Sequence, residues 1–444
     1  MPPLNEPIAA VATPPGRGAI AMLRISGSDL SRIADQLLGK LPPPRVASYR
    51  PVYGADHEPI DEAIVIYFAA PKSFTGEDTL EIQTHGGDVV INDVLQAAIT
   101  AGARHAAPGE FSERAFLNGK IDLIQAEAVA DLIESSTSLA ARLAHRSLAG
   151  HFSREVKAIT KKLISFHVQL EATIDFPEEN ITAPALADMV ARSLDVYQHL
   201  SRLLQEAQRG AKLNAGLNIA IVGRPNVGKS TLLNVLAHEE RAIVTNIPGT
   251  TRDVLTVDIN VRGLPVRFYD TAGLREAEDP IEIEGVQRAK QAIELSDAVF
   301  FLVVDKSDEL EEFINGLAIP VFKIRNKIDL DHLGTFSEKR SNGAYIQISA
   351  KHEQGIELLH EAIIDHFNLA QDRDNMILAR DRHLSGLSAA RDALNFDHEQ
   401  HYRDAPELGA EDLRRAVRAL SALTGEYTSE ELLGDIFSTF CIGK

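Results

Sequence analysis

The segment that decides the fold is Gly223-Arg224-Pro225-Asn226-Val227-Gly228-Lys229-Ser230. It lies between a strand-like apolar run at 217–222 and a helix-like run at 231–236, which is the context of a phosphate-binding loop. Glycines let successive backbone N–H groups turn toward phosphate oxygens, a lysine reaches the β and γ phosphates, and a serine hydroxyl can bind Mg²⁺. The bland alternative, a tight turn with an exposed lysine, is disfavoured by the strand and the helix on either side. The segment therefore predicts a bound nucleoside triphosphate.

Two downstream motifs have the order and character of nucleotide-sensing switches. Residues 249–253 read Gly-Thr-Thr-Arg-Asp and offer a threonine that can complete the Mg²⁺ shell. Residues 270–273 read Asp-Thr-Ala-Gly and end a strand-like run at 266–269. The predicted phosphate and switch residues are Asn226, Val227, Gly228, Lys229, Ser230, Thr231, Gly249, Thr250, Thr251, Asp270, Thr271, Ala272 and Gly273, with Ser230 and Thr251 as the Mg²⁺ ligands.

Two later motifs select the base. Asn326-Lys327-Ile328-Asp329 follows a strand-like run at 320–325, and its aspartate can accept the two N–H groups that guanine presents. Adenine lacks that pair of donors, and a buried carboxylate left unpaired discriminates strongly against the wrong base. Residues 349–351 read Ser-Ala-Lys and match a short loop that closes over guanine. The sequence thus predicts a GTPase domain whose base-binding residues are Asn326, Lys327, Asp329, Ser349, Ala350 and Lys351.

One position departs from the Ras pattern. Leu274 stands where Ras-like proteins carry the glutamine that orients the attacking water, and leucine cannot do so. Either hydrolysis is very slow, or another group positions the water and neutralises charge. The polar candidates nearby are Asn226, Arg252, Arg275, Glu276 and Glu282.

Composition limits the compartment and the partners. A chain of 444 residues predicts two or three domains, and its net charge of −19 disfavours coating of nucleic acid by bulk charge. A local basic surface could still contact one RNA. The single cysteine, Cys441, permits no intramolecular disulfide, and neither an apolar run of membrane-spanning length nor an unbroken signal-peptide core is present. We therefore expect a cytoplasmic protein that does not enter a membrane.

The segments on either side of the GTPase domain predict its surroundings. Strand-like runs at 19–25, 63–68 and 79–83 and a helix near 89–101 indicate a mixed α/β domain. Apolar residues spaced by three and four over 152–174 predict a long helix, and further helices are expected at 186–208 and beyond 375. Because the last segment is too short for a core of its own, we expect it to pack on the earlier helices. The predicted division is 1–118, 119–215 for a first helical part, 216–374 for an inserted GTPase domain, and 375–444.

Two short features stay ambiguous from chemistry alone. His85-Gly86-Gly87 follows a predicted strand, and such a sequence is more often a plain turn than a site. The tail Cys441-Ile442-Gly443-Lys444 follows an apolar helix. Most tails fray, so a functional role requires this one to be docked, where the lysine would favour the thiolate of Cys441.

The chain resembles the tRNA modification GTPases called MnmE or TrmE along its whole length. Pro7 replaces a usual threonine, and Pro280 precedes Ile281-Glu282, but neither departure touches a position with an expected role. The motifs that carry the resemblance are residues 10–16, 23–27, 73–78, 85–87, 108–120 and 441–444, together with the GTPase motifs.

The resemblance implies an α/β multidomain fold with three parts. These are an N-terminal domain like folate-binding domains, a helical domain split in sequence, and an inserted Ras-like domain. It also implies homodimers formed through the N-terminal domain. A tetrahydrofolate derivative would be bound by Arg24, Glu81 and Lys120, with Lys444 brought in by the docked tail.

The same resemblance implies an answer to the problem of Leu274. In the family, K⁺ supplies the positive charge that an arginine finger supplies elsewhere. Here Asn226, Thr245, Ile247 and Thr250 would hold K⁺, while Glu282 would position the attacking water. Hard oxygen ligands suit both K⁺ and Mg²⁺. The GTP site would then also include Thr245, Asn246, Ile247 and Pro248.

The implied function is GTP hydrolysis coupled to modification of the wobble uridine of tRNA at C5, with an FAD-containing partner, MnmG. A one-carbon unit from tetrahydrofolate would become the methylene of a (carboxymethyl)aminomethyl group, and Cys441 would act chemically or merely anchor the tail. A ribosome-assembly GTPase acting as an RNA-binding switch is the main alternative. It shares the GTPase motifs but leaves the N-terminal motifs and the tail unexplained. A folate-dependent one-carbon transferase regulated by GTP is a second.

Overall fold

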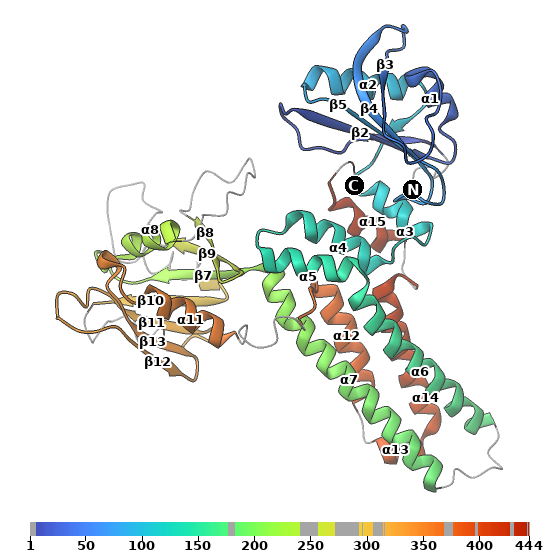
Figure 1. The fold of residues 1–444 in the computed structure, drawn as a ribbon. Helices are drawn as coiled ribbons and strands as arrows, with labels where there is room; N and C mark the ends of the chain where they lie inside the picture. Colours follow the sequence, from blue (N-terminus) through green and yellow to red (C-terminus); the bar gives the residue numbers. More distant parts are fainter. Residues whose placement is uncertain are drawn as a thin grey trace. The chain divides into compact units, whose positions relative to one another are not determined.

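A computed structural model describes residues 6–175, 183–239, 256–270, 293–294, 296–304, 314, 316–367, 376–395, 398–426, 430–441 and 443. Its contacts divide the chain into two compact units, each interrupted in sequence. Unit 1 comprises Met1–Ala130, Leu148–Gln169 and Leu413–Lys444, and unit 2 comprises Asp131–Ser147 and Leu170–Asp412. Figure 1 shows the elements of both units.

Unit 1 contains a six-stranded sheet in the order β3-β4-β5-β2-β1-β6. All neighbouring pairs are antiparallel except β1 and β6, which are parallel. The strands are β1 (Ile8–Val11), β2 (Ile20–Gly27), β3 (Ser48–Tyr53), β4 (Pro59–Phe68), β5 (Asp78–His85) and β6 (Arg104–His105).

Two helices, α1 (Ser31–Leu38) and α2 (Asp88–Thr100), form one core with this sheet. Alternate strand residues, such as Leu23 and Ile82, point into that core, as expected for a sheet covered on one side. Residues of the opposite alternation include Ile20, Tyr49 and Ile64, whose side chains are 61%, 70% and 42% exposed. This second face is mixed, because it also carries Arg24 and Glu81 and is partly covered by Phe111, and it leaves these three apolar side chains exposed.

The rest of unit 1 is helical. A cluster formed by Leu123, Ala126, Leu433, Phe437 and Phe440 joins the segment after the sheet to the C-terminal helix. Its helices are α3 (Glu110–Leu117) and α15 (Glu430–Ser438), together with parts of α4 (Leu123–Glu134), α6 (His151–Asp175) and α14 (Pro406–Thr424).

Unit 2 contains a seven-stranded sheet in the order β12-β13-β11-β10-β7-β9-β8. Its five central strands run parallel, and β8 and β12 are antiparallel edge strands. The strands are β7 (Leu217–Val222), β8 (Thr256–Val261), β9 (Leu264–Asp270), β10 (Ala298–Val303), β11 (Val321–Arg325), β12 (Phe336–Arg340) and β13 (Gly343–Gln347). Helices α8 (Lys229–Glu239) and α11 (Ile356–His366) share its main core, and η1 (Ala350–His352) follows β13.

Helices of unit 2 extend from this sheet. The 33-residue α7 (Ala183–Ala215) packs against α12 (Asp381–Ala393) and α13 (His398–Asp404). Within that packing, the buried Ser193 hydroxyl lies 2.9 Å from His398 Nδ1 and 2.8 Å from the Tyr402 hydroxyl. Helix α5 (Ser138–Leu148) contributes Leu139, Leu143 and Ala144 to the core of the sheet.

The main sequence-based elements are confirmed. The predicted strands at 19–25, 63–68 and 79–83 correspond to β2, β4 and β5, and the long helix at 152–174 is α6. Strand β7 begins two residues after α7 ends, beside the boundary predicted at 216. Within the described ranges, no helix is long and apolar enough to cross a membrane.

Candidate functional site

The phosphate-binding loop lies between the end of β7 and the start of α8, as predicted. Gly228 has φ 99°, and a β-carbon there would overlap the side-chain amide nitrogen of Asn326. Only glycine accommodates both this backbone conformation and the close approach of Asn326. Asn226 also has a positive φ of 64°, and Ser230 lies exposed at the second position of α8. The loop therefore has the backbone shape that directs amide groups and a hydroxyl toward a bound anion.

Lys229 is held over the loop that it belongs to. Its Nζ donates to the carbonyl oxygens of Gly223 at 2.7 Å and Arg224 at 3.0 Å. The residue as a whole is buried, which is uncommon for lysine and requires polar partners. Its ammonium group is thus fixed where it would meet phosphate oxygens.

Asn326 joins the phosphate-binding loop to the loop expected to close over guanine. Its Nδ2 donates to the Val227 carbonyl at 2.9 Å, and its Oδ1 accepts from the Ala350 N–H at 2.9 Å. The neighbouring Lys327 donates from Nζ to the Asn226 carbonyl at 2.6 Å. Segments about 100 residues apart in sequence are therefore held together by two adjacent side chains of one motif.

Asp329 is prepared for base recognition by Ser349. The Ser349 hydroxyl donates to Asp329 Oδ1 at 2.6 Å, and His352 Nε2 lies 3.8 Å from Oδ2. The hydrogen bond from Ser349 is the main cause that lowers the pKa of Asp329 below its ordinary value. The carboxyl group therefore stays ionised and oriented, ready to accept the N–H groups of guanine.

The structure brings together the two ends of the predicted GTP site. The phosphate-binding loop and the start of α8 contain the predicted residues Asn226, Val227, Gly228, Lys229, Ser230 and Thr231. The base-binding end contains Asn326, Lys327, Asp329, Ser349, Ala350 and Lys351. Asp270 is the last residue of β9. The predicted residues Thr245, Asn246, Ile247, Pro248, Gly249, Thr250, Thr251, Thr271, Ala272, Gly273 and Glu282 lie outside the described residues, as does Leu274.

A second candidate site lies in unit 1, where the C-terminal tail meets the sheet. Arg24 and Glu81 face each other across β2 and β5, and Arg24 Nη2 lies 2.9 Å from Glu81 Oε1. Arg24 Nη1 donates to the Gly443 carbonyl at 3.4 Å, and its guanidinium lies 5.8 Å from the ring centre of Phe111. Two of the expected folate-binding residues are therefore adjacent to each other and to the tail.

Gly443 is where the tail is docked. Its φ is 96°, and an added β-carbon would lie 2.7 Å from the Val11 carbonyl oxygen and 3.2 Å from Ala12 Cα. Gly443 is buried, and the Gly109 N–H donates to the Cys441 carbonyl at 3.4 Å. The condition for a functional tail, docking, is thus met on the described residues.

Two further predicted positions lie at the surface. Cys441 is a free and exposed thiol. Lys120 is exposed, and its Nζ donates to the Pro71 carbonyl at 2.8 Å. Lys444 lies outside the described residues. Both Lys120 and Cys441 are exposed and therefore accessible to a ligand, but their contacts assign them no role.

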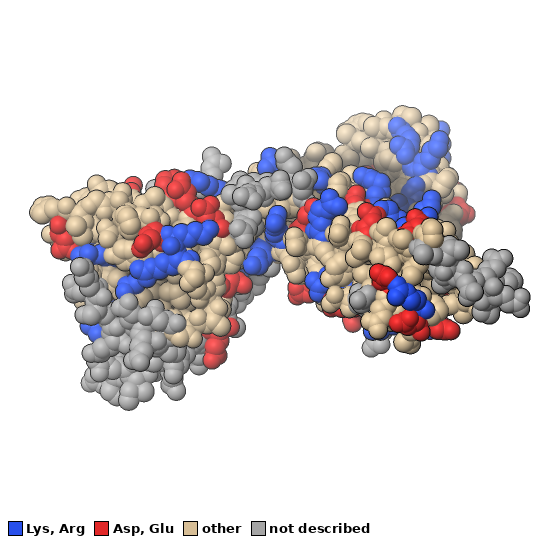
Figure 2. Space-filling view, turned by 90° about the horizontal axis from the view of Figure 1, so that it is seen from below, with Lys and Arg blue, Asp and Glu red and all other residues tan. Residues whose placement is uncertain are grey.

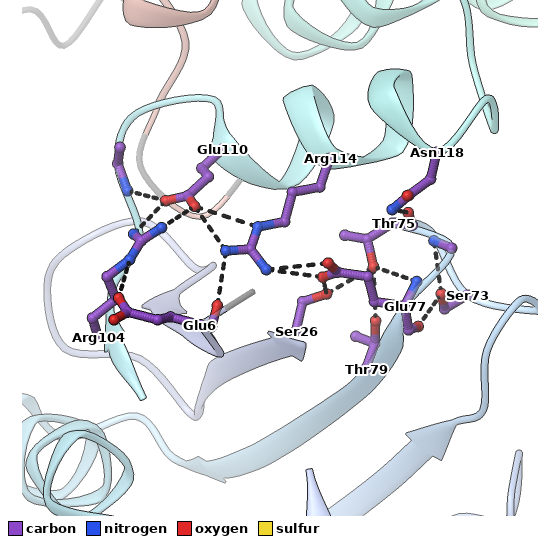
Figure 3. A network of polar contacts seen from close by, with 12 residues as sticks. Glu6, Ser26, Ser73, Thr75, Glu77, Thr79, Arg104, Glu110, Arg114 and Asn118 are labelled. Carbon is purple, nitrogen blue, oxygen red and sulfur yellow. Dashed lines mark hydrogen bonds and ion pairs between the residues drawn. The ribbon is translucent and has the colours of Figure 1, made fainter. Parts of the chain in front are cut away.

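The polar network in Figure 3 was missed by sequence reasoning. Glu110 is 2% exposed and accepts from both Arg104, at 2.5 Å, and Arg114, at 2.9 Å. Arg114 is 1% exposed and reaches Glu77 on its other side at 3.0 Å. Burial alone would raise the pKa of Glu110, but the hydrogen bonds from Arg104, Ala107 and Arg114 outweigh burial and lower it.

This network fixes the segment that precedes and supports the tail site. It ties α3 to β6 through Arg104 and to the loop before β5 through Glu77, while the Asn118 side chain donates to the Thr75 carbonyl at 2.8 Å. Residues 73–78 and 108–120, noted above for the family resemblance, therefore contact each other. The available signal was the spacing of Glu110 and Arg114, which are four residues apart and so share one helix face.

Comparison with known proteins gives matches along the whole chain. The family description "MnmE helical domain" matches residues 123–441, and "GTP-binding protein TrmE N-terminus" matches residues 7–120. The tRNA modification GTPase MnmE of Stutzerimonas stutzeri is 47% identical, with 100% of each chain covered. Those of Pseudomonas paraeruginosa and Hydrogenovibrio crunogenus are 47% and 44% identical, with 99% of each chain covered.

Similarity to solved structures is weaker. The G domain of the T. maritima FeoB iron transporter is 22% identical, with 34% of this chain and 98% of that chain covered and a TM-score of 0.24.

Proposed function

The chain belongs to the MnmE family of tRNA modification GTPases, and from that premise we propose that it hydrolyses GTP to drive modification of tRNA. The chain is an α/β multidomain protein in which a TrmE-type N-terminal domain and an MnmE-type helical domain accompany a GTP-binding fold. The observation that carries the proposal is the side chain of Asn326, which ties the phosphate loop to the base-binding loop. The proposed target is C5 of the wobble uridine.

The described residues divide the work of binding GTP. Lys229 meets the negative charge of the phosphates, and the backbone amides around Gly228 add hydrogen bonds that water would otherwise supply. Asp329, held ionised by Ser349, reads guanine. Because guanine offers two donors where adenine does not, the same carboxylate disfavours ATP.

The proposed ions fit the donors that the chain offers. The exposed Ser230 hydroxyl and Thr251 are oxygen donors of the kind that Mg²⁺ prefers, and Asn226, Thr245, Ile247 and Thr250 offer oxygens to K⁺. Bound there, the two cations would neutralise charge that develops on the phosphates. Since Leu274 cannot orient water, Glu282 is the residue proposed to do so.

The tail site is proposed to hold a tetrahydrofolate derivative. Arg24 is a suitable partner for a carboxylate or a polar ring edge, and Glu81 fixes the orientation of its guanidinium group. Lys120 and Lys444 would supply further charge. We propose that the one-carbon unit delivered here enters the uridine substituent, with an FAD-containing partner, MnmG, supplying the redox chemistry.

The exposed apolar residues of the unit 1 sheet support the proposed homodimer. Ile20, Tyr49 and Ile64 are large exposed apolar side chains on one face of a sheet, and such patches commonly mark interfaces. A cytoplasmic location fits the single free thiol of Cys441. In the proposed complex, each copy would present its own tail site and its own GTP site.

The test measures GTP hydrolysis by the purified protein with Mg²⁺ in K⁺ buffer and in Na⁺ buffer. Asn226→Ala and Glu282→Ala are measured alongside. We expect a strong K⁺-specific stimulation in the native protein that both variants lose. Equal rates in the two salts would overturn the cation mechanism.

Coupling is tested separately with the FAD-containing partner and tRNA. We expect Lys229→Ala and Asp329→Asn to lose wobble-uridine modification together with GTP turnover. Full modification by either variant would show that hydrolysis does not drive the reaction. The two experiments thus separate the chemistry of hydrolysis from its use.

A further inference from the structure

At the β12 edge of the GTP-binding sheet, one face packs into the core and the other carries charged and aromatic side chains. Strands β11, β13 and β12 are in register, with Lys323 opposite Tyr345 and Tyr345 opposite Glu338. Side chains of one alternation, such as Phe322 and Ile346, enter the core shared with α11. The other alternation carries Lys323 and Arg325 on β11, Tyr345 and Gln347 on β13, and Phe336, Glu338 and Arg340 on β12.

Flat side chains gather in the middle of this face. The ring centres of Phe336 and Tyr345 are 6.4 Å apart, and the Arg340 guanidinium carbon lies 5.1 Å from the ring centre of Tyr345. Gln347 Nε2 donates to the Tyr345 hydroxyl at 3.1 Å, which fixes the ring. Phe336 remains 48% exposed, although burial of a phenylalanine is ordinarily favourable. Tyr345 thus packs against both the exposed ring of Phe336 and the exposed guanidinium group of Arg340.

The charge of the face is opposite to that of the chain. The face carries Lys323, Arg325 and Arg340 together with Glu338, in a protein whose net charge is −19. Asp331, from the adjoining loop, lies 2.7 Å from Arg325. Figure 2 views the molecule from below and shows a band of Lys and Arg side chains on the GTP-binding fold, at the left. A local excess of cations on an acidic protein suits an anionic partner.

We propose that the face formed by Lys323, Arg325, Phe336, Arg340 and Tyr345 binds a single-stranded segment of RNA. The inference rests on the proposed function, which makes tRNA the substrate, and it assigns that substrate a surface. Unpaired bases stack on aromatic rings and on guanidinium planes, while neighbouring cations contact the phosphates. Phe336 and Arg340 on β12 offer the stacking groups, and Lys323 and Arg325 both lie two strands away, on β11.

An RNA partner accounts for the combination of features better than a protein partner. The centre of a protein interface is depleted in charged residues, whereas here Glu338 and Arg340 flank the ring of Tyr345. Every residue from 330 to 340 is exposed, whereas Lys323, Arg325 and Tyr345 are half-buried, so the most accessible part of the face is β12. The surface also lies outside the loops that bind GTP, so changes on it leave Lys229 and Asp329 untouched.

The experiment measures binding of a fluorescent anticodon stem-loop RNA to the full chain by anisotropy over a series of salt concentrations. Phe336→Ala and Arg340→Ala are compared with Leu408→Ala and Arg262→Ala. The two controls remove an exposed apolar side chain and an exposed arginine at other places. GTP hydrolysis is measured on every variant, and we expect it to stay unchanged.

We expect Phe336→Ala to weaken RNA binding by about 5- to 150-fold, the range for loss of one stacked base. Arg340 is a cation as well as a stacking plane, so Arg340→Ala should weaken binding and also reduce the slope of affinity against salt by about 0.7 to 1, the value for one lost positive charge at the phosphates. The controls should bind like the native protein. Because stacking is insensitive to salt, the two variants should differ in their salt dependence.

Three outcomes would overturn the inference. Native-like RNA binding by both variants would mean that RNA lies elsewhere, and unchanged tRNA modification would leave the proposed function intact. Normal RNA binding with lost binding to the FAD-containing partner would identify the face as a protein interface. Absence of RNA binding by the native chain would remove the basis of the inference, whereas failure of native tRNA modification would instead refute the proposed function.

Discussion

Replacement of Asn326 by alanine tests whether one side chain holds the two halves of the GTP site together. The change removes two buried hydrogen bonds of 2.9 Å, one to the Val227 carbonyl and one from the Ala350 N–H. Each contributes about 1 kcal/mol net, and a buried N–H left without an acceptor costs about 1–3 kcal/mol. Without the bridge we expect the loops to separate, so that nucleotide binding must restore their alignment. The penalty of about 2–4 kcal/mol corresponds to about 30- to 1,000-fold weaker binding.

The assay is a titration of a fluorescent GDP analogue in Mg²⁺ buffer, with urea unfolding measured on the same preparations. Asn342→Ala is the matched control, because Asn342 is exposed and its side chain donates only to the Leu317 and Ile319 carbonyls among the described contacts. It should bind nucleotide as the native protein does. If Asn326→Ala kept its fold and bound GDP within roughly threefold of the native affinity, the bridge would be irrelevant to binding and the reasoning would be refuted.

Three further predictions follow from other contacts. Ser349→Ala should raise the pKa of Asp329 toward its ordinary value and weaken GDP binding, most strongly at acidic pH. Measurement of GDP affinity over a pH series checks this, and identical pH profiles of the native protein and the variant would contradict it. Gly443→Val should displace the tail and lower tRNA modification about tenfold or more while GTP hydrolysis persists, with Gly434→Ala as control because its site is open. Glu110→Gln should cost about 3–5 kcal/mol of unfolding free energy at neutral pH. Because the folded-state pKa of Glu110 is lowered, its contribution is present above its ordinary pKa and is lost as pH falls through the lowered one, so urea curves of native and variant should converge in acid.

The sequence was sufficient for features that are local in the chain. A strand, a glycine-containing loop and a helix follow one another around Lys229, and the side-chain types at 326–329 specify guanine chemistry. Such motifs can be recognised because the ligand, rather than the rest of the fold, dictates their spacing. The docking of the tail also followed from the family resemblance, and the position of Gly443 agrees with it.

Contacts between distant segments could not be derived in this way. Arg114 and Glu77 lie 37 residues apart, and only the packing of α3 beside the sheet makes them partners. Neither residue belongs to an amphipathic pattern that would predict its burial. The same holds for β12, whose five residues are all exposed and lack the apolar alternation of a half-buried strand. Its pairing with β13, rather than its own composition, makes it a strand.

Helix α5 packs against the hairpin that leads to the second switch motif, so the two elements are mechanically coupled. Gly263 forms the turn between β8 and β9, and a β-carbon there would lie 3.3 Å from Leu139 Cβ on α5. Leu139 and Leu143 share one core with strand residues of β8 and β9, and β9 ends at Asp270, the first residue of a switch motif. Close-packed interiors resist the opening of voids, so a shift of this hairpin must move α5 or sacrifice core contacts. Helix α5 ends at Leu148, where the chain enters unit 1. A displacement of α5 is therefore passed along the backbone into that unit.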